Sequence, residues 1–206
     1  MKVIEREIQP FQEKDFFDPI RDKASFARLI VYSARQLLLD FSTSGIKTTF
    51  KMKLIVDKMS RLFFYRDNKY FSVAFPLTIL TNGTDVTEIS TYSGKRLDFI
   101  NISAVISILD SDYYHNNPSL IDFPIEPMSI EESGIYILEE IIQFEPAYIR
   151  YDHDPDNENG KIHPLDHLDI NYSQSGTYKL GLFNSISNSF FENIQNTTSE
   201  CSYVVE

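Results

Sequence analysis

Apolar and polar positions follow a helical period at three places along the chain. Over residues 19–41 the apolar side chains recur every three or four positions, which predicts an amphipathic helix. A capping-box pattern that begins at Ser129 opens a second predicted helix over 130–143. A short C-terminal helix is predicted after Ser185 or Ser187, because either hydroxyl would cap its first turn.

From residue 50 onward the period changes to two, which is typical of strands. Residues 61–66 and 69–75 flank Asp67-Asn68, two residues that tolerate the positive φ of a tight hairpin turn. A second hairpin is predicted around residues 92–95. The last third of the chain predicts three more strands, over 147–153, 167–172 and 177–183.

Residues 98–109 fit both periods. Four isoleucines and Ala104 at the even positions 100–108 alternate with Asn101, Ser103, Val105 and Ser107, and this period of two with β-branched side chains favours a strand. Asp98 would equally cap a helix that starts at the next residue. The assignment therefore stays open between strand and helix.

Together these elements predict an α+β fold, with antiparallel hairpins and a sheet, an N-terminal helix, a helix near 130–143 and a C-terminal helix. Residues 1–17 are interpreted as a flexible arm, and residues 18–206 as a single α+β domain. The polar, proline-punctuated loop over 110–128 would be the junction if that domain consists of two lobes.

The composition supports a real core and limits the partners. The chain has 206 residues, 42% of them hydrophobic, with 16 Phe and 12 Tyr. Its 30 acidic and 19 basic residues give a net charge of −11, which repels phosphate backbones, so we expect no direct binding of nucleic acid. A single cysteine excludes a disulfide framework, and no apolar run is long enough for a membrane span. The charged start lacks a secretory signal, so the expected location is the cytoplasm.

One window of the sequence is chemically unusual, because three of the four histidines lie within residues 153–167. Strand alternation sorts the side chains on either side of this window onto two faces. If the three C-terminal strands pair as a meander, one polar face carries Arg150, Asp152, His167, Asp169 and Lys179. Such a face brings a cation, carboxylates and an imidazole within reach of one another.

Three interpretations of this face remain open. His163 and His167 with Asp152 or Asp169 would supply ligands for a divalent metal ion such as zinc, manganese or iron. Alternatively, either histidine would act as an acid or base without a metal, with Asp152 and Asp169 as its carboxylate partners and Arg150 or Lys179 as the phosphate-binding cation. In the third interpretation, residues 152–160 form an ordinary hairpin loop and the histidines are structural.

The same region contains short motifs in a fixed order. Arg150-x-Asp152 lies in a predicted strand, and His163-Pro164-x-x-His167-Leu168, a strand over 178–182 and Ser187 to Phe191 follow it. Over residues 146–194 this order resembles an uncharacterised bacterial family, a domain of unknown function of similar length. The chain departs from that pattern at Asp169, where another histidine is expected, and at a basic position of the short strand. The resemblance implies an accessory part of a bacterial defence or toxin–antitoxin module.

Two functions follow as hypotheses. The first is an accessory or interaction subunit that binds a protein partner through an aromatic hairpin containing Phe63, Phe64, Tyr65, Tyr70 and Phe71. The alternative is a small metal-dependent or acid–base hydrolase, similar in chemistry to a nuclease, that uses the polar face over 150–179. The sequence contains no GxxxxGK[ST], GxGxxG, GxSxG or HExxH motif, which argues against nucleotide hydrolysis, dinucleotide binding, serine esterase chemistry and zincin proteolysis.

Overall fold

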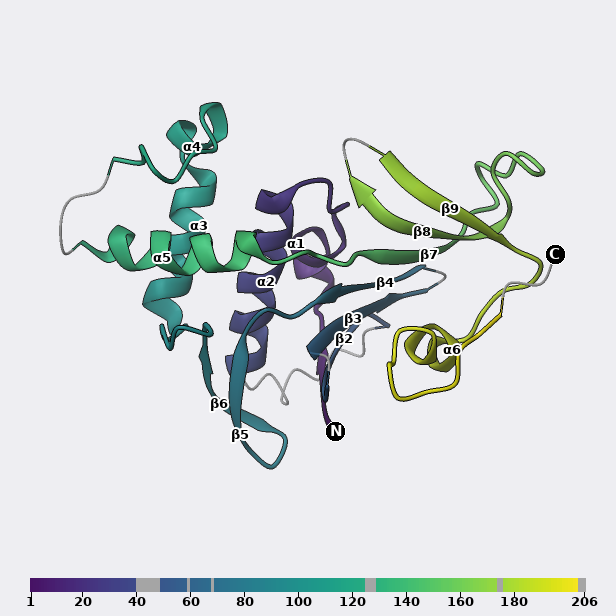
Figure 1. The fold of residues 1–206 in the computed structure, drawn as a ribbon, viewed down its shortest axis with the longest axis horizontal. Helices are drawn as coiled ribbons and strands as arrows, with labels where there is room; N and C mark the ends of the chain where they lie inside the picture. Colours follow the sequence, from purple (N-terminus) through teal and green to yellow (C-terminus); the bar gives the residue numbers. More distant parts are fainter. Residues whose placement is uncertain (40–48, 59, 68, 125–128, 174–175, 204–206) are drawn as a thin grey trace. The chain divides into compact units, whose positions relative to one another are not determined.

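Strands from three separate parts of the chain assemble into one sheet, and helices dominate the segments between them (Figure 1). The structure is a computed structural model, and it describes residues 1–39, 49–58, 60–67, 69–124, 129–173 and 176–203. The chain divides into two units. Unit 1 consists of Met1–Glu13, Ile46–Ala74 and Pro146–Glu206, and unit 2 of Lys14–Gly45 and Phe75–Glu145.

Unit 1 is built on a seven-stranded sheet with the strand order β1-β2-β3-β4-β7-β8-β9, in which every neighbouring pair is antiparallel. Its strands are β1 (Lys2–Glu7), β2 (Lys51–Val56), β3 (Ser60–Arg66), β4 (Lys69–Ala74), β7 (Ile149–His153), β8 (Asp166–Ser173) and β9 (Gly176–Leu182). The predicted strands in both halves of this sheet are therefore confirmed. The turn predicted between the last two strands includes residues 174–175, which lie outside the described residues.

One face of the sheet carries a hydrophobic cluster that helix α6 (Asn188–Asn193) covers (Figure 1). Phe191 of α6 is fully buried in this cluster, which also contains Phe63, Tyr65, Tyr151 and Leu168. The Ser187 side chain accepts a hydrogen bond from the backbone N–H of Phe190, so Ser187 is the cap of this helix.

The N-terminal residues differ from the expected flexible arm. Strand β1 pairs with β2 in register from Lys2↔Val56 to Glu7↔Lys51, and the 3₁₀ helix η1 (Pro10–Gln12) and the helix α1 (Glu13–Phe17) follow it. The sequence of β1 is mostly polar because β1 is an edge strand with one solvated face. Of its six side chains, that of Ile4 is buried.

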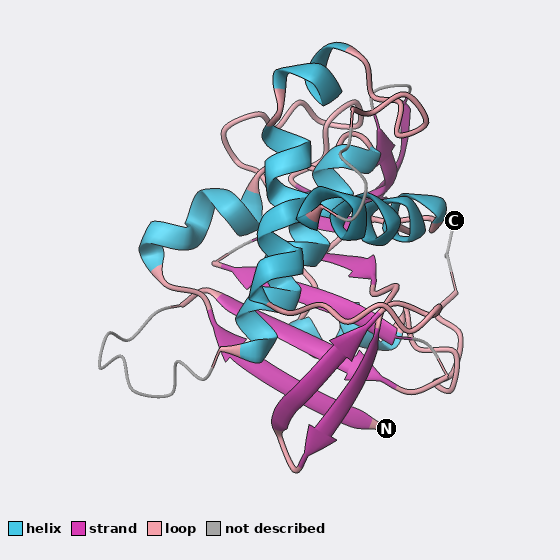
Figure 2. Cartoon of the chain, turned by 90° about the vertical axis from the view of Figure 1, so that its left-hand side faces the viewer, coloured by secondary structure: helices cyan, strands magenta, loops and turns pink. Residues whose placement is uncertain are grey.

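Unit 2 combines helices with a two-stranded sheet (Figure 2). Helix α3 packs against α5 and α2, and α2 also packs against α5 and β6. The elements are α2 (Lys23–Leu38), β5 (Thr78–Asn82), β6 (Asp85–Ser90), α3 (Phe99–Asp110), α4 (Asp112–Asn116) and α5 (Ile130–Gln143). Among the helices of the described residues, none has both the length and the apolar character needed to cross a membrane.

Both predicted helices of unit 2 are confirmed; α5 has the predicted bounds, and α2 begins later than predicted. α2 begins at Lys23 because the Asp22 side chain accepts a hydrogen bond from the backbone N–H of Ser25. The predicted end of this helix near residue 41 lies outside the described residues. Ser129 caps α5 through a hydrogen bond from the N–H of Glu132.

The ambiguous segment 98–109 is a helix. Asp98 accepts a hydrogen bond from the backbone N–H of Asn101 and so caps α3. The segment packs closely on α5, because a Cβ added at Gly134 would lie 2.9 Å from the Cβ of Ala104. Packing against a neighbouring helix therefore decides an assignment that local pattern leaves open.

Two loop predictions need correction. Residues 92–95 form a turn closed by an isolated bridge between Ser90 and Arg96, and α3 follows in place of a return strand. The second hairpin is β5–β6, which turns at Gly83 with a φ of +63°. The predicted loop over 110–128 contains α4. Its residues 110–124 all belong to unit 2, so the junction between the units does not lie there. The boundaries between the units lie at 13–14, 45–46, 74–75 and 145–146.

Candidate functional site

The polar face predicted from strand alternation lies on β7, β8 and β9 (Figure 1). In the β7–β8 register Arg150 lies opposite Asp169, and Asp152 lies opposite His167. Directly opposed residues of an antiparallel pair share a face and have neighbouring Cβ atoms. The register therefore brings these four side chains together, and we call them the β7–β8 cluster.

Arg150 bridges the two carboxylates of the cluster. Its Nε lies 2.7 Å from Asp152 Oδ2, and its Nη2 donates a hydrogen bond of 2.6 Å to Asp169 Oδ2. The Asp152 and Asp169 side chains are only 4% and 1% exposed, whereas that of Arg150 is 22% exposed. Burial alone would lower the pKa of Arg150, but Tyr148 and the two carboxylates outweigh it and raise that pKa. Arg150 thus stays charged and connects the buried cluster with solvent.

His167 is held in one orientation by a backbone acceptor. Its Nδ1 lies 2.9 Å from the carbonyl oxygen of Pro164, and a carbonyl oxygen can only accept, so Nδ1 carries the proton. In the neutral ring Nε2 then has a free lone pair, and this atom lies 3.9 Å from Asp152 Oδ2. The His167 side chain is 1% exposed, so the lone pair points into the cluster and away from bulk water.

Pro164 is itself positioned by close packing on β9. Gly181 lies opposite His167 in the β8–β9 register, and a Cβ at Gly181 would lie 2.9 Å from Pro164 Cγ. The absence of a side chain at Gly181 allows Pro164 to approach the sheet and present its carbonyl to His167.

Each carboxylate of the cluster retains one oxygen without a hydrogen bond. Asp152 Oδ1 and Asp169 Oδ1 are buried and accept no hydrogen bond from the part of the chain that the structure describes. Lys69 Nζ is 3.8 Å from Asp152 Oδ1, beyond hydrogen-bond distance. Asp152, His167 and Asp169 each offer one ligand atom, and these atoms lie within 4.8 Å of one another.

The other two predicted site residues lie beside the cluster and bind each other. Lys179 is opposite Asp169 in the register, but its Nζ lies 3.1 Å from His163 Nδ1. His163 Nε2 lies 3.4 Å from Asp154 Oδ2, so the two ring nitrogens of His163 face Lys179 and Asp154, which lie outside the cluster. The rings of His163 and His167 contact edge to face, with centroids 4.7 Å apart. Asp169 therefore takes the place that the sequence assigned to His163 in a ligand set.

A second polar group lies on the opposite face of the same strands, and the sequence did not single it out. Tyr151 OH donates a hydrogen bond of 2.5 Å to Asp166 Oδ1, and His153 Nδ1 lies 2.9 Å from the same oxygen. Burial opposes ionisation of Asp166, but these hydrogen bonds outweigh it and lower its pKa. His153 lies opposite Asp166 in the β7–β8 register, and this cross-strand pairing is the signal that could have identified the group.

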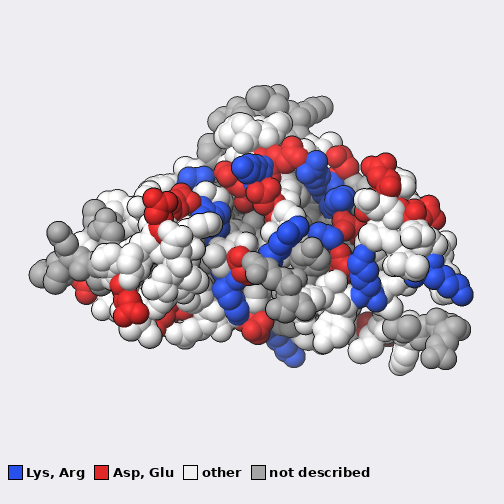
Figure 3. All heavy atoms as spheres, turned by 90° about the horizontal axis from the view of Figure 1, so that it is seen from above, with Lys and Arg blue, Asp and Glu red and all other residues white. Residues whose placement is uncertain are grey.

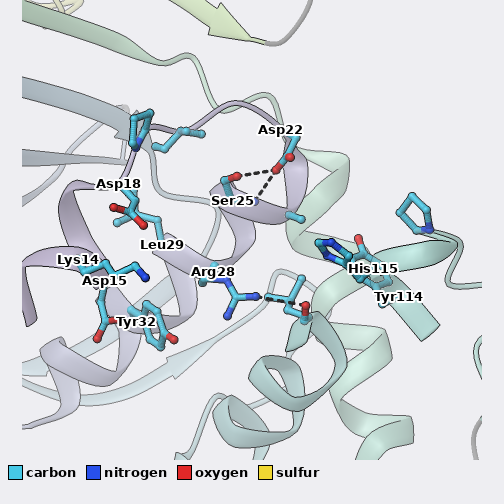
Figure 4. A pocket seen from close by; sticks show the side chains of 15 residues that line it. Lys14, Asp15, Asp18, Asp22, Ser25, Arg28, Leu29, Tyr32, Tyr114 and His115 are labelled. Carbon is cyan, nitrogen blue, oxygen red and sulfur yellow. Dashed lines mark hydrogen bonds between the residues drawn. The ribbon is translucent and has the colours of Figure 1, made fainter. Parts of the chain in front are cut away.

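Unit 2 contains an open pocket of about 810 Å³ between α1, α2 and α4 (Figure 4). Its lining combines acidic and basic side chains with two tyrosines, as Figure 4 shows. Arg28 is already paired there with Asp110 at 2.6 Å, and Asp22 is engaged as the cap of α2. His115 lines this pocket from α4, although the sequence suggested a loop at that position.

Comparison with known proteins found no matching family model, no matching curated protein and no matching solved structure. Any function must therefore be argued from the residues and geometry of this chain.

Proposed function

We propose that this chain is a hydrolase of phosphate esters and that the β7–β8 cluster is its catalytic site. The observation that supports the proposal is the convergence of one cation, two carboxylates and an imidazole on one face of the sheet. Hydrolysis of a phosphate ester requires an activated water and a fixed cation that stabilises the charge of the transition state. The cluster and its borders contain groups of both kinds.

The roles follow from exposure and hydrogen bonding. His167 Nε2 and the free carboxylate oxygens supply lone pairs that would take a proton from water or hold an ion that activates it. Arg150 and Lys69, at 22% and 55% side-chain exposure, border the cluster on the solvent side and would hold the substrate anion. The buried groups would thus act on water, and the exposed cations on phosphate.

The charge distribution favours a small substrate. The protein has a net charge of −11, and on the face drawn in Figure 3 the Lys and Arg side chains lie among Asp and Glu. A long nucleic acid needs a continuous basic track, because each neutralised phosphate contributes to its affinity. A phosphate ester that reaches Arg150 and Lys69 needs two cations only.

The aromatic hairpin that motivated the accessory-subunit hypothesis is mostly buried. Phe63, Phe64, Tyr65 and Phe71 are buried in the protein, and Tyr70 is half-buried and stacks on Tyr151. A side chain in the core cannot bind a partner while the protein is folded. The aromatic hairpin therefore contributes to stability, and a protein partner would need another surface.

The test is hydrolysis of p-nitrophenyl phosphate, bis-p-nitrophenyl phosphate and RNA and DNA oligonucleotides by the full chain with Mg²⁺, Mn²⁺ or Zn²⁺ added. We expect turnover of at least one p-nitrophenyl ester, and a loss of about 10²–10⁴-fold in His167→Gln, the range for removing an acid–base group. His115→Gln, which changes a histidine of unit 2, should retain full activity. No turnover by the folded wild type, or equal turnover by His167→Gln, would refute the proposal.

A further inference from the structure

Asp152, His167 and Asp169 place three possible metal-ligand side chains on one face of β7 and β8. The three side chains come from adjacent strands, are at most 4% exposed, and present one ligand atom each within 4.8 Å of the others. We propose that they bind one divalent transition-metal ion, with two carboxylate oxygens and one imidazole nitrogen as protein ligands. The assignment rests on the proposed function only for the role of the ion, which would activate the water in that hydrolysis.

Two buried oxygens support the site independently of the acidic character of the cluster. Asp152 Oδ1 and Asp169 Oδ1 belong to side chains that are 4% and 1% exposed, and neither accepts a hydrogen bond within the described residues. Buried polar atoms in native proteins are nearly always hydrogen-bonded, so an exception asks for a partner that a protein structure alone does not contain. A cation between the two carboxylates would satisfy both oxygens.

The imidazole is oriented as a metal ligand. A histidine that binds a metal usually donates its other ring N–H to a carbonyl or carboxylate, which fixes the tautomer and the ring direction. His167 Nδ1 has this partner in the Pro164 carbonyl at 2.9 Å, and Nε2 faces Asp152 Oδ2 at 3.9 Å. Both of these facing atoms are acceptors while the ring is neutral, so they cannot bond to each other, and the Nε2 lone pair remains available to a cation.

Arg150 does not engage every oxygen of the two carboxylates. The guanidinium occupies the Oδ2 atoms of Asp152 and Asp169, and the Oδ1 atoms stay available. Arg150 neutralises one of the two carboxylate charges, and the second cation nearby, Lys69, is 55% exposed and lies 3.8 Å from Asp152 Oδ1. Metal–ligand distances near 2.0–2.2 Å place neighbouring ligand atoms about 3–3.5 Å apart, so the side chains would close slightly on the ion.

Ligand chemistry suggests the class of metal. One imidazole and two carboxylates suit Zn²⁺, Mn²⁺ or Fe²⁺, and an all-oxygen site would instead favour Mg²⁺ or Ca²⁺. Three protein ligands leave at least one coordination position for water, which is the arrangement of a catalytic rather than a structural metal.

The experiment measures Zn²⁺ and Mn²⁺ binding to the full chain by calorimetry, and the metal content after dialysis by mass spectrometry. We expect one ion per chain in the wild type, and at least a tenfold weaker affinity in Asp169→Asn and in His167→Gln. His163→Gln is the matched control, because the His163 nitrogens face Lys179 and Asp154, and it should bind the ion with wild-type affinity. No ion bound by the folded wild type, unchanged affinity in Asp169→Asn and His167→Gln, or a loss of binding in His163→Gln would each overturn the assignment.

A second measurement keeps the assignment testable if the variants do not fold. X-ray absorption of the zinc-loaded wild type should show one imidazole and oxygen ligands, and two imidazoles would overturn the proposed ligand set. Failure of the metal site and failure of the proposed function are distinguishable. An ion bound at these residues without any hydrolysis supports the site and removes the function, whereas hydrolysis that survives removal of all metal by EDTA supports the function and overturns the catalytic ion.

Discussion

Replacing Arg150 by methionine removes the cation that two buried carboxylates share. Its guanidinium contacts Asp152 at 2.7 Å and Asp169 at 2.6 Å, and those side chains are 4% and 1% exposed. Methionine retains an unbranched apolar side chain, so the main change is the loss of positive charge. Removing one partner of a buried ion pair costs about 3–5 kcal/mol, because the other charge is left buried and uncompensated.

We therefore expect the Arg150→Met substitution to lower the free energy of unfolding at pH 7 by about 3–5 kcal/mol. Arg66→Met is the matched control. Arg66 pairs with Glu13 at 2.5 Å, but the two side chains are 40% and 36% exposed. Water screens such a pair, so its loss should cost about 1 kcal/mol or less.

Urea unfolding followed by circular dichroism, extrapolated linearly to water, measures the difference. EDTA in every sample keeps adventitious ions from compensating the lost cation. The triple variant Arg150→Met/Asp152→Asn/Asp169→Asn should recover at least about 2 kcal/mol relative to Arg150→Met, because it contains no unpaired buried charge. The reasoning is refuted if Arg150→Met costs no more than Arg66→Met, or if the triple variant is no more stable than the single one.

Two further predictions concern unit 2. Gly134→Ala should stabilise α5 by about 1 kcal/mol through helix propensity. The added Cβ would lie 2.9 Å from the Cβ of Ala104, and this overpacking should cost about 1–3 kcal/mol. Thermal unfolding should therefore show a net destabilisation. Gly134→Ser should be at least as destabilised, and a more stable Gly134→Ala would contradict the close approach of α3 and α5. Burial opposes ionisation of Glu140, but hydrogen bonds from Ser93 and Thr91 outweigh it and lower its pKa below the ordinary 4.5. Its carboxylate therefore stabilises the fold above pH 4.5, and the contribution disappears as the pH falls through the lower folded-state pKa. Glu140→Gln should lower the free energy of unfolding by on the order of 1 kcal/mol at pH 7 and by progressively less in acid. Urea unfolding at a series of pH values measures the difference, and a difference that does not change with pH would contradict this prediction.

The strands around the candidate site could be predicted from the sequence because their alternation is unambiguous. Tyr151 and Leu168 are apolar and buried on one face, while Asp152 and Asp169 lie on the other, as a period of two requires. β8 ends at Ser173 and β9 begins at Gly176, and so short a connection makes antiparallel pairing the simplest arrangement of these two strands. The face on which each of these side chains lies, and the order of the three C-terminal strands, therefore followed from the sequence pattern alone.

Other elements could not be predicted because tertiary contacts outweigh weak local preferences. In α3, Ile102, Val105, Ile108 and Leu109 are buried at helical spacing, yet the isoleucines also alternate as in a strand. Gly134 is a poor helix former when considered alone, and its value lies in the close contact of α5 with α3. An element whose pattern fits two periods is decided by the neighbour against which it packs.

The composition of the β7–β8 cluster depends on atoms that neighbour one another across strands and not along the chain. A search for metal ligands by spacing selects His163 and His167, since they are four residues apart. In the fold, the carbonyl of Pro164, which lies between them, holds His167 towards Asp152. Gly181 allows Pro164 to lie this close because a side chain there would collide with it. His163 is thereby directed to Lys179, and Asp169, which lies nineteen positions from Arg150, enters the cluster through the β7–β8 register. The sequence thus predicts that this face is polar, whereas the partners of each polar atom depend on strand register and on one proline–glycine contact.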